Sequence, residues 1–494
     1  MTLPSNDGQT TISDGQTTIS PLKPFQSILA RRDILKIGSL GIAASALPFA
    51  NSQVVASDIA STTSEVDSVV LLWMAGGVTH LESFDPKPEA PEQIRGTLDP
   101  IATAIPGIAF GEVMPGLARL ANELAILRSY SHDSNDHFLS QGFALSGRRV
   151  NLSQITTEPN VGAIVSYLKG SRSGLPGYIA IPGTTRPGPP PHNLFVGGWL
   201  GGQYGPFAVG GQPDEPDFTV PFARDETPVE IVNEDLRPPA LTLRPDLTSI
   251  RLSRRDSLRK QLDQRLLSLE QSNPRLSMDN HYQHAFHLLG SPSIRSSFNL
   301  SEESDAVRES YGRTKIGSRC LLARRLVEAD ARFVMVDYGY DPDYGNLWDN
   351  HAVPVQRQPH ISEIAKKSYH LAGVDRACSA LIRDLKERGR LDRTLVVFLT
   401  EFGRTPTINA NGGRDHWGPA GSLFFAGGGI QGGQVIGNTD KHASYPTGRG
   451  YSPADIAATI YAKLGIPDDT ILYDRQNRPV PLLPEGDAIS ELTS

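Results

Sequence analysis

Histidine and carboxylate side chains stand close together at several places in this sequence, and their pairing points to metal chemistry. Five of the twelve histidines stand beside carboxylates in four loops predicted to follow strands, in the stretches THLESFD, SHDSNDH, LWDNH and RDHWG. Imidazole and carboxylate groups bind zinc, manganese and iron, and an incomplete set leaves a position open for water or substrate. The candidate metal ligands are His80, Asp85, Asp349, His351, Glu401 and His416.

Three further residues could act on a substrate. Arg404 in TEFGRTP and Arg414 in GGRDHWG are suited to an oxyanion, because a guanidinium group donates two parallel hydrogen bonds to phosphate, sulfate or carboxylate. His137 could move a proton, since an imidazole pKa near ~6.5 suits proton exchange at neutral pH.

Each of these motifs also has a purely structural interpretation. An Asp-x-His pair is often a turn or a cap, and Glu401 could form a local ion pair with Arg404. The metal interpretation is favoured because four predicted strand ends carry such residues together.

Apolar runs alternate with amphipathic segments, and this order predicts the elements that must position the candidate residues. Buried strands are predicted at 68–74, 124–128, 177–181, 333–336, 395–400 and 423–426. Helices are predicted over 371–388 and from Ser452-Pro453 onward, where Ser is the N-cap and Pro the first helical residue.

This alternation indicates an α/β fold, a three-layer α/β/α sandwich with a parallel-rich central sheet. The domain is expected to span 65–490, with a loop and helix insertion at about 183–330 that is rich in Pro and Gly at its start. Ligands bind beyond the carboxyl ends of strands in such sheets, so the candidate residues should meet at one edge. Three other histidines, His281, His284 and His287, are spaced unfavourably for one helix face and are interpreted as surface or packing residues.

The N-terminal region is interpreted as a targeting segment. The heptapeptide DGQTTIS occurs twice in tandem, at 7–13 and 14–20, and residues 1–30 are expected to be disordered. The motif Arg31-Arg32-Asp33-Ile34-Leu35-Lys36 precedes a mildly apolar stretch of small residues, which is typical of a twin-arginine signal peptide over 31–56. The twin-arginine export machinery is thus an expected partner, with a periplasmic or cell-surface destination. The alternative is a basic amphipathic helix of a cytosolic protein.

Composition excludes several classes of protein. The 494 residues carry 47 Lys and Arg against 54 Asp and Glu, a net charge of −7, without the basic cluster that nucleic acid binding requires. Two cysteines cannot build a disulfide framework or a cysteine-rich zinc site. No apolar run reaches the ~18 residues of a membrane-spanning helix, so no stable transmembrane span is expected.

Taken together, these stretches resemble the bacterial exported proteins of the domain of unknown function 1501 family. The matching segments lie within about 31–485 and are RRDILKIG, LLWMAGGVTHLESFDPKP, SHDSNDHFLSQGFALSG, LWDNH, TEFGRTPTINANGGRDHWGPAGSLFFAGGGIQGGQVIG and the SPAD helix start. That family in turn resembles the alkaline phosphatase and sulfatase superfamily, which implies an α/β/α sandwich with metal at the strand tips.

The resemblance also implies roles for individual residues. Glu401 stands where the superfamily has a metal-binding Asp, and Phe402 replaces the His or Asn that follows it. Asp349 and His351 resemble a ligand pair, and His416 resembles a late His ligand. His137 occupies the position of the usual nucleophile.

The resulting hypothesis is an exported, metal-dependent hydrolase of phosphate or sulfate esters that uses a metal-activated water. Zinc or manganese is expected rather than calcium or magnesium. The substrate would be a small-molecule or polysaccharide ester. Asp349, His351, Glu401 and His416 would hold the metal, with His80 and Asp85 as substitutes for a missing first-strand acid. The alternative is a non-catalytic metal- or glycan-binding protein on the same scaffold.

Overall fold

The computed structural model describes residues 66–183, 197–209, 236–238, 291–341, 344–354 and 358–493, together with 251, 254, 257 and 258. The tandem heptapeptide, the twin-arginine motif and His281, His284 and His287 lie outside the described residues. Within the described part of the chain, none of the helices combines the length and apolar character that a membrane crossing requires.

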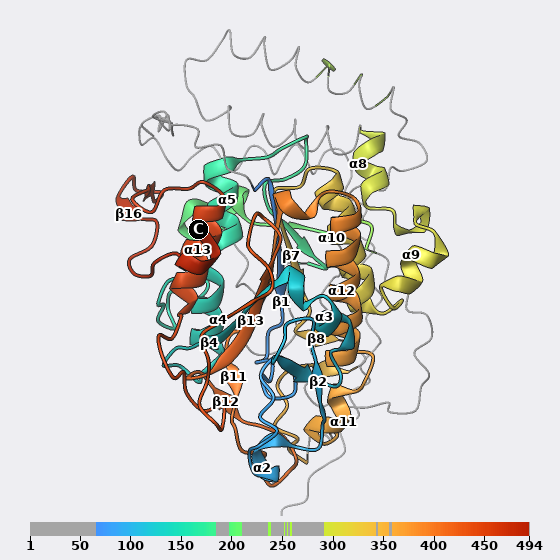
Figure 1. Cartoon of the computed structure of the whole chain (residues 1–494). Coiled ribbons are helices and arrows are strands. Elements are labelled where there is room, and N and C mark those ends of the chain that lie inside the picture. The colour runs from blue at the N-terminus through green and yellow to red at the C-terminus, as the bar shows by residue number, and fades with distance from the viewer. Residues whose placement is uncertain are drawn as a thin grey trace, which may run out of the picture. The chain divides into compact units, whose positions relative to one another are not determined.

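A mixed sheet runs through the middle of the domain (Figure 1). In spatial order its strands are β14 (Gln434–Ile436), β4 (Leu124–Tyr130), β13 (Gly421–Ala426), β10 (Thr394–Leu399), β1 (Ser68–Trp73), β7 (Phe333–Asp337), β5 (Ile179–Ile181) and β6 (Phe207–Ala208). β13 is antiparallel to both of its neighbours, and every other pair in the sheet is parallel. Seven strands therefore end at the same edge, and the expected parallel-rich sheet is confirmed.

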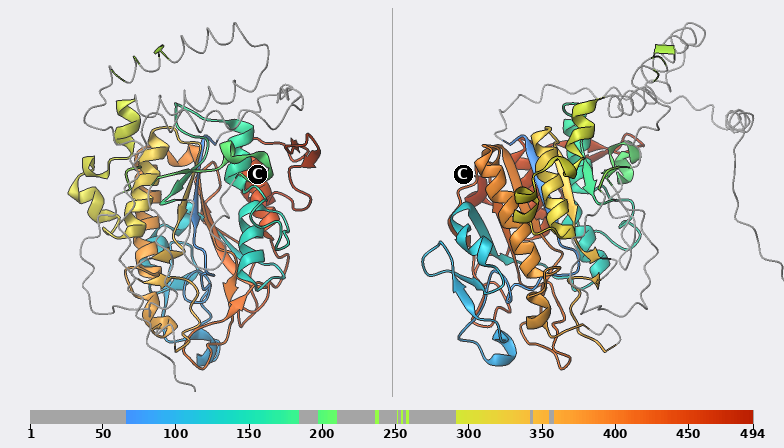
Figure 2. Two further views of the ribbon diagram at one scale, coloured as in Figure 1. Left: turned by 180° about the vertical axis from the view of Figure 1, so that it is seen from behind. Right: turned by 90° about the vertical axis from the view of Figure 1, so that its right-hand side faces the viewer.

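Helices cover both faces of the sheet, as Figures 1 and 2 show from three sides. One layer contains α3 (Pro115–Arg119), α10 (Lys315–Glu328), α11 (Ile361–Ala365) and α12 (Leu371–Glu387). The other contains α4 (His137–Ser146), α5 (Val161–Lys169), α13 (Pro453–Lys463) and α14 (Ser490–Thr493). The expected α/β/α sandwich is thereby confirmed.

The alternation of side chains along β1 explains why both faces need cover. Val70 and Leu72 belong to one buried cluster, whereas Val69, Leu71 and Trp73 belong to the other. Successive side chains of a strand point to opposite faces, so a continuous apolar run requires helices on both sides.

Smaller elements decorate this sandwich. The two-stranded ribbons are β2 (Pro100–Ala102) with β3 (Ala109–Gly111), β8 (Tyr340–Asp341) with β9 (Gly345–Asn346), β11 (Gly403–Arg404) with β12 (His416–Trp417), and β15 (Ile471–Tyr473) with β16 (Pro479–Pro481). The remaining short helices are α2 (Glu92–Arg95), α8 (Pro292–Ser297) and α9 (Asp305–Ser310). Part of the expected 183–330 insertion belongs to the sandwich itself, because β6 extends the sheet and α10 packs on α12.

Candidate metal centre

The loops at the carboxyl edge of the sheet bring most of the candidate residues together. His137 begins α4 after β4, Asp349 and His351 follow β7 and the β8–β9 ribbon, and Glu401 follows β10. His416 lies in β12 just before β13, and the reversed direction of β13 places its first residue at the same edge. The topology therefore explains how residues from four distant segments meet.

Local secondary structure determines the positions of His137 and His416. The side chain of Asp136 accepts the backbone N–H of Leu139, and this N-cap makes His137 the first residue of α4. β12 pairs with β11, which places His416 opposite Arg404.

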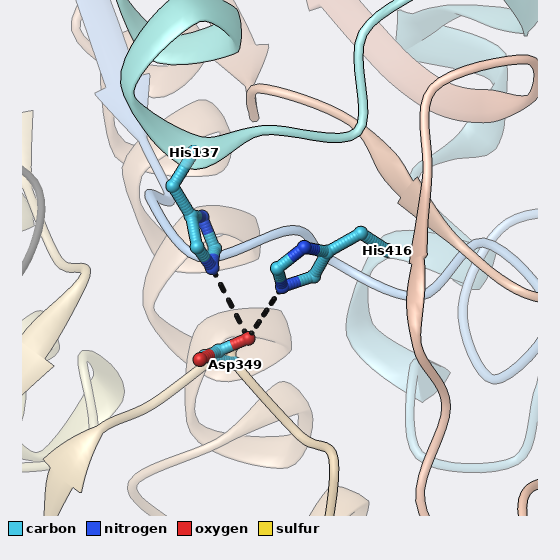
Figure 3. Close-up of side chains that lie close together, drawn as sticks. All are labelled: His137, Asp349 and His416. Atoms are coloured by element: carbon cyan, nitrogen blue, oxygen red, sulfur yellow. Dashed lines mark hydrogen bonds and ion pairs between the residues drawn. The ribbon is translucent and has the colours of Figure 1, made fainter.

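The carboxylate of Asp349 lies at the centre of the site, and Figure 3 shows His137 and His416 converging on it. The side-chain atom Oδ1 of Asp349 is 3.0 Å from Nε2 of His416, 3.0 Å from Nε2 of His351 and 3.2 Å from Nε2 of His137. One ligand atom each from His137, Asp349 and His416 lies within 4.8 Å of the other two. We call His137, Asp349, His351 and His416 the Asp349 cluster. Their side chains keep 15% to 23% of their surface exposed, so a ligand can reach them.

Each histidine of the Asp349 cluster has a second partner on its other ring nitrogen. The Nδ1 contacts are His137 with Oε1 of Glu401 at 2.9 Å, His351 with Oδ1 of Asp415 at 2.7 Å, and His416 with the backbone oxygen of Asn135 at 2.9 Å. A carbonyl or carboxylate oxygen only accepts, so each Nδ1 carries a hydrogen. A ring that is neutral then has its Nε2 lone pair free for a cation at the centre, whereas without a cation an Nε2 that contacts Asp349 donates a hydrogen to it. Metal-binding histidines are oriented in this way by their outer partners.

The direct contact between His351 and His416 bears on whether a cation fits at the centre of the site. Nε2 of His351 is 2.9 Å from Nε2 of His416. Two facing lone pairs repel, so this arrangement requires a proton or another positive charge between the rings. The imidazole nitrogens of His137 and His416 and the carboxylate oxygen of Asp349 form a donor set of the kind that binds a divalent transition metal.

The pKa values of the metal-free cluster are strongly shifted. Burial by itself lowers the pKa of His137, but hydrogen bonds to Asp349 and Glu401 outweigh it and raise the pKa to about 9. The hydrogen bond to Asp349 raises the pKa of His351, whereas burial lowers that of His416. Burial favours a higher pKa for Asp349, yet hydrogen bonds from the three histidines hold it well below its usual range. A pKa of about 9 keeps His137 protonated at neutral pH when no metal is bound.

Glu401 contacts Nδ1 of His137, the ring nitrogen that does not face Asp349. Its buried carboxylate accepts the backbone N–H of Gly76 at 2.7 and 2.8 Å and the side-chain amide of Gln141 at 3.0 Å, in addition to the contact with His137. These donors occupy both carboxylate oxygens. The imidazole of His137 therefore faces Asp349 at the centre of the site, and Glu401 is the acceptor that orients this imidazole.

Arg404 contacts Asp349 from within the protein interior. The fully buried guanidinium donates to Asp349 at 2.9 Å, to the backbone oxygen of Gly77 at 2.9 Å and to that of Trp348 at 2.7 Å, and it also contacts Gly76. These acceptors make Arg404 a positioning residue for Asp349, and we do not retain its predicted contact with an oxyanion.

Arg414 is also enclosed in protein. Its guanidinium pairs with the buried carboxylate of Glu82 at 2.5 Å and donates to the backbone oxygen of Ile94 at 2.7 Å. It is completely buried. We therefore leave Arg414 out of the substrate site as well.

Phe402 provides an apolar floor for the cluster. Its ring centroid is 5.1 Å from that of His137 and 4.7 Å from that of His416. The ring can occupy this position because Gly77 lacks a side chain: a Cβ there would lie 2.5 Å from the ring, and the φ angle is +88°. The Phe that replaces an expected ligand thus packs beneath two imidazoles.

His80 and Asp85 have partners outside the Asp349 cluster. Nε2 of the buried His80 contacts the backbone oxygen of Ala443 at 2.9 Å. Asp85 accepts a hydrogen bond from Thr439 and pairs with Arg128 at 3.3 Å. Both side chains thereby attach the loop after β14 to the loop after β1, and the structure does not bring them into the Asp349 cluster.

Two orienting groups were not predicted as site residues. Asp415 is adjacent to the predicted ligand His416, and this adjacency was the available signal. Asn135 acts through its backbone oxygen, for which the residue type carries no information.

Comparisons with known proteins complete the description. A family model described as DUF1501, protein of unknown function, matches residues 66–493. No curated protein matches the chain.

Several solved structures show a weak likeness to this chain. The phosphonate monoester hydrolase SpPMH from Silicibacter pomeroyi is 12% identical with a TM-score of 0.35, covering 87% of this chain and 76% of its own. The PsFucS1 sulfatase from Pseudoalteromonas sp. is 14% identical with a TM-score of 0.33, covering 82% and 68%. Ps i-CgsB in complex with k-i-k-neocarrahexaose is 11% identical with a TM-score of 0.36, covering 81% and 72%. At such scores the likeness carries no conclusion about activity.

Proposed function

The chain belongs to the DUF1501 family of proteins of unknown function, and on that premise we propose that it is a metal-dependent hydrolase of phosphate or sulfate esters. The observation that carries the proposal is the convergence of three imidazole Nε2 atoms on Oδ1 of Asp349, each with an acceptor already on its Nδ1. We propose zinc or manganese rather than calcium or magnesium, because hard cations prefer all-oxygen sites.

The residues of the site divide into two groups. His137, Asp349 and His416 would hold the metal, since their ligand atoms form one compact group. Glu401 and the Asn135 carbonyl would keep the two imidazoles in the orientation that presents Nε2. A bound divalent ion would act as a Lewis acid on a water molecule or an ester oxygen.

His351 is proposed to complete the site. Its Nε2 faces Asp349 and His416, and its Nδ1 faces the exposed carboxylate of Asp415. His351 would thus serve as a fourth ligand or hold a proton beside the metal. The contact of His351 with Asp415 is of the same kind as the contact of His137 with Glu401, since in both a carboxylate oxygen faces Nδ1 of the imidazole.

A non-catalytic metal-binding protein is the second candidate, and one observation favours it. Both arginines expected to bind the oxyanion, Arg404 and Arg414, are fully buried and hydrogen-bonded within the protein. Neither guanidinium would then neutralise the charge of an ester oxyanion.

The experiment that separates the two candidates begins with metal content. Purified protein is loaded with Zn²⁺ or Mn²⁺, and hydrolysis of 4-nitrophenyl phosphate, bis(4-nitrophenyl) phosphate and 4-nitrophenyl sulfate is measured beside Asp349→Ala. Turnover that requires both the metal and Asp349 supports the hydrolase. Tight metal binding without turnover on these esters or on sulfated polysaccharide favours the binding protein.

We also propose that residues 31–56 form a twin-arginine signal ahead of the folded domain. The pair Arg31-Arg32 and the small-residue stretch after it support this proposal. Replacement of both arginines by lysine should leave the full-length chain in the cytoplasm, whereas Lys23→Arg should leave export unchanged. Export of the double variant at the normal rate would contradict the proposal.

A further inference from the structure

A cavity of about 680 Å³ lies between α3 and α12, away from the residues of the Asp349 cluster. The two helices pack against each other, and α12 supplies five of the twelve lining residues. We call it the α3–α12 cavity and define it by Arg119, Lys366, Asp375, Arg376, Ser379 and Arg383. Its volume is within the range of cavities that bind small organic molecules.

Positive charge is in excess at the rim of the cavity. Lys366 pairs with Glu112 at 3.3 Å, and Arg376 pairs with Glu309 at 2.9 Å. The other two cations, Arg119 and Arg383, are exposed and make no ion pair or hydrogen bond with another described side chain. Two guanidinium groups from different helices therefore line the same cavity, and the charge of Arg119 also acts on Asp375. Guanidinium groups of this kind are suited to an oxyanion.

The buried carboxylate of Asp375 forms the floor of the cavity and is fixed by hydrogen bonds from the backbone of α3. Asp375 is 4% exposed and accepts the backbone N–H groups of Gly116 at 2.8 Å and Leu117 at 2.7 Å. A Cβ at Gly116 would lie 2.5 Å from Oγ of Ser379, so only glycine allows α3 to approach α12 this closely. The first N–H groups of α3 are thereby already bonded and are not offered to a ligand.

The floor still has capacity for hydroxyl groups. Each carboxylate oxygen of Asp375 accepts one backbone N–H and retains a lone pair for a second donor. Oγ of Ser379 donates to the backbone oxygen of Arg376 and keeps its lone pairs for a further donor. A fitting ligand thus has hydroxyl groups on one side and an oxyanion on the other.

We propose that the α3–α12 cavity binds a sugar that carries a sulfate or phosphate group, with the oxyanion on Arg119 and Arg383 and sugar hydroxyls on Asp375 and Ser379. This is a binding site separate from the metal centre. It stands on the chemistry of its own lining and does not depend on the hydrolase proposal.

The test is a calorimetric titration of metal-free protein with glucose 6-sulfate, glucose 6-phosphate, glucose and inorganic sulfate. The wild type should bind at least one of the two esters with one site per chain, at least tenfold more tightly than glucose or inorganic sulfate. The double variant Arg119→Gln/Arg383→Gln should weaken this binding at least tenfold. The control Arg95→Gln/Arg475→Gln removes the same charge from exposed arginines outside the cavity and should bind as the wild type does.

Two further variants keep the outcome decisive. Ser379→Ala should weaken binding of the sugar ester but leave that of inorganic sulfate unchanged. Asp349→Ala should bind the ester normally even if it has lost its metal, which separates failure of this proposal from failure of the hydrolase proposal. Undetectable binding of both esters at millimolar concentration, or equal losses in the two double variants, would overturn the assignment. Glucose or inorganic sulfate binding as tightly as the esters would overturn it as well.

Discussion

The Nδ1 atom of His137 lies 2.9 Å from the Oε1 atom of Glu401, and this contact determines which of the two residues faces the metal site. The imidazole directs Nε2 toward Asp349, while the carboxylate is taken up by the backbone of Gly76 and the amide of Gln141. Glu401 is thus expected to influence metal affinity through His137.

Replacement of Glu401 by glutamine should weaken metal binding without abolishing it. The amide oxygen can still accept from His137, but the carboxylate charge is lost, and changes of this kind reduce metal affinity about 10- to 100-fold. Competition with a chromophoric chelator measures the affinity. A loss as complete as that of Asp349→Ala would return Glu401 to the role of a direct ligand.

His80→Ala should lower stability while leaving the metal content unchanged. The substitution empties a buried position and removes the hydrogen bond to Ala443, together about 2–4 kcal/mol. Urea denaturation and elemental analysis of the same sample provide the two readouts. A folded His80→Ala protein that lacks metal would show that the histidine takes part in the site after all.

Gly77→Ala should damage both the fold and the metal site. Gly77 and Gly107 both have positive φ, +88° and +78°, but a Cβ at Gly77 would collide with Phe402, whereas Gly107 has nothing within 4 Å. Gly107→Ala should therefore cost only the backbone strain, about 1–2 kcal/mol. Gly77→Ala should cost more and also weaken metal binding, because the Phe402 ring supports His137 and His416. Equal effects of the two substitutions would contradict the packing role of Gly77.

Asp375 should make the domain less stable as pH rises from about 4 to 6. Burial raises the pKa of this carboxyl from 3.8 to about 6. Because the folded pKa lies above the unfolded one, the stabilisation is fully present below pH 3.8 and is lost as the pH rises through about 6. The difference corresponds to about 3 kcal/mol at most. Urea unfolding of wild type and Asp375→Asn across this range measures it; parallel pH profiles for the two proteins would contradict the shift.

The predicted elements agree with the structure because they depend on patterns within a few residues. The apolar run 68–74 appears as β1 (Ser68–Trp73), and the helix predicted over 371–388 appears as α12 (Leu371–Glu387). Ser452 caps α13 as its position before Pro453 indicated. Continuous apolar runs require cover on both faces, and this requirement already specifies a layered sandwich.

The residue types of the site were predictable, but their orientations were not. Asp349, His351 and His416 meet because their strands end at one edge of the sheet. Whether His137 or Glu401 faces inward depends on Gly76, which lies 325 residues before Glu401 in the chain. The burial of Arg404 and Arg414 likewise depends on distant backbone oxygens, so an arginine beside an acidic residue was read as a substrate contact.

The measurement that tests the central claim most directly is elemental analysis of wild type beside Asp349→Ala, with His360→Ala as a control outside the Asp349 cluster. Each protein is purified after metal supplementation. We predict about one equivalent of zinc or manganese in the wild type and the control, and none in folded Asp349→Ala. A wild type without metal, or a folded Asp349→Ala that retains a full equivalent, would contradict a metal centre at Asp349.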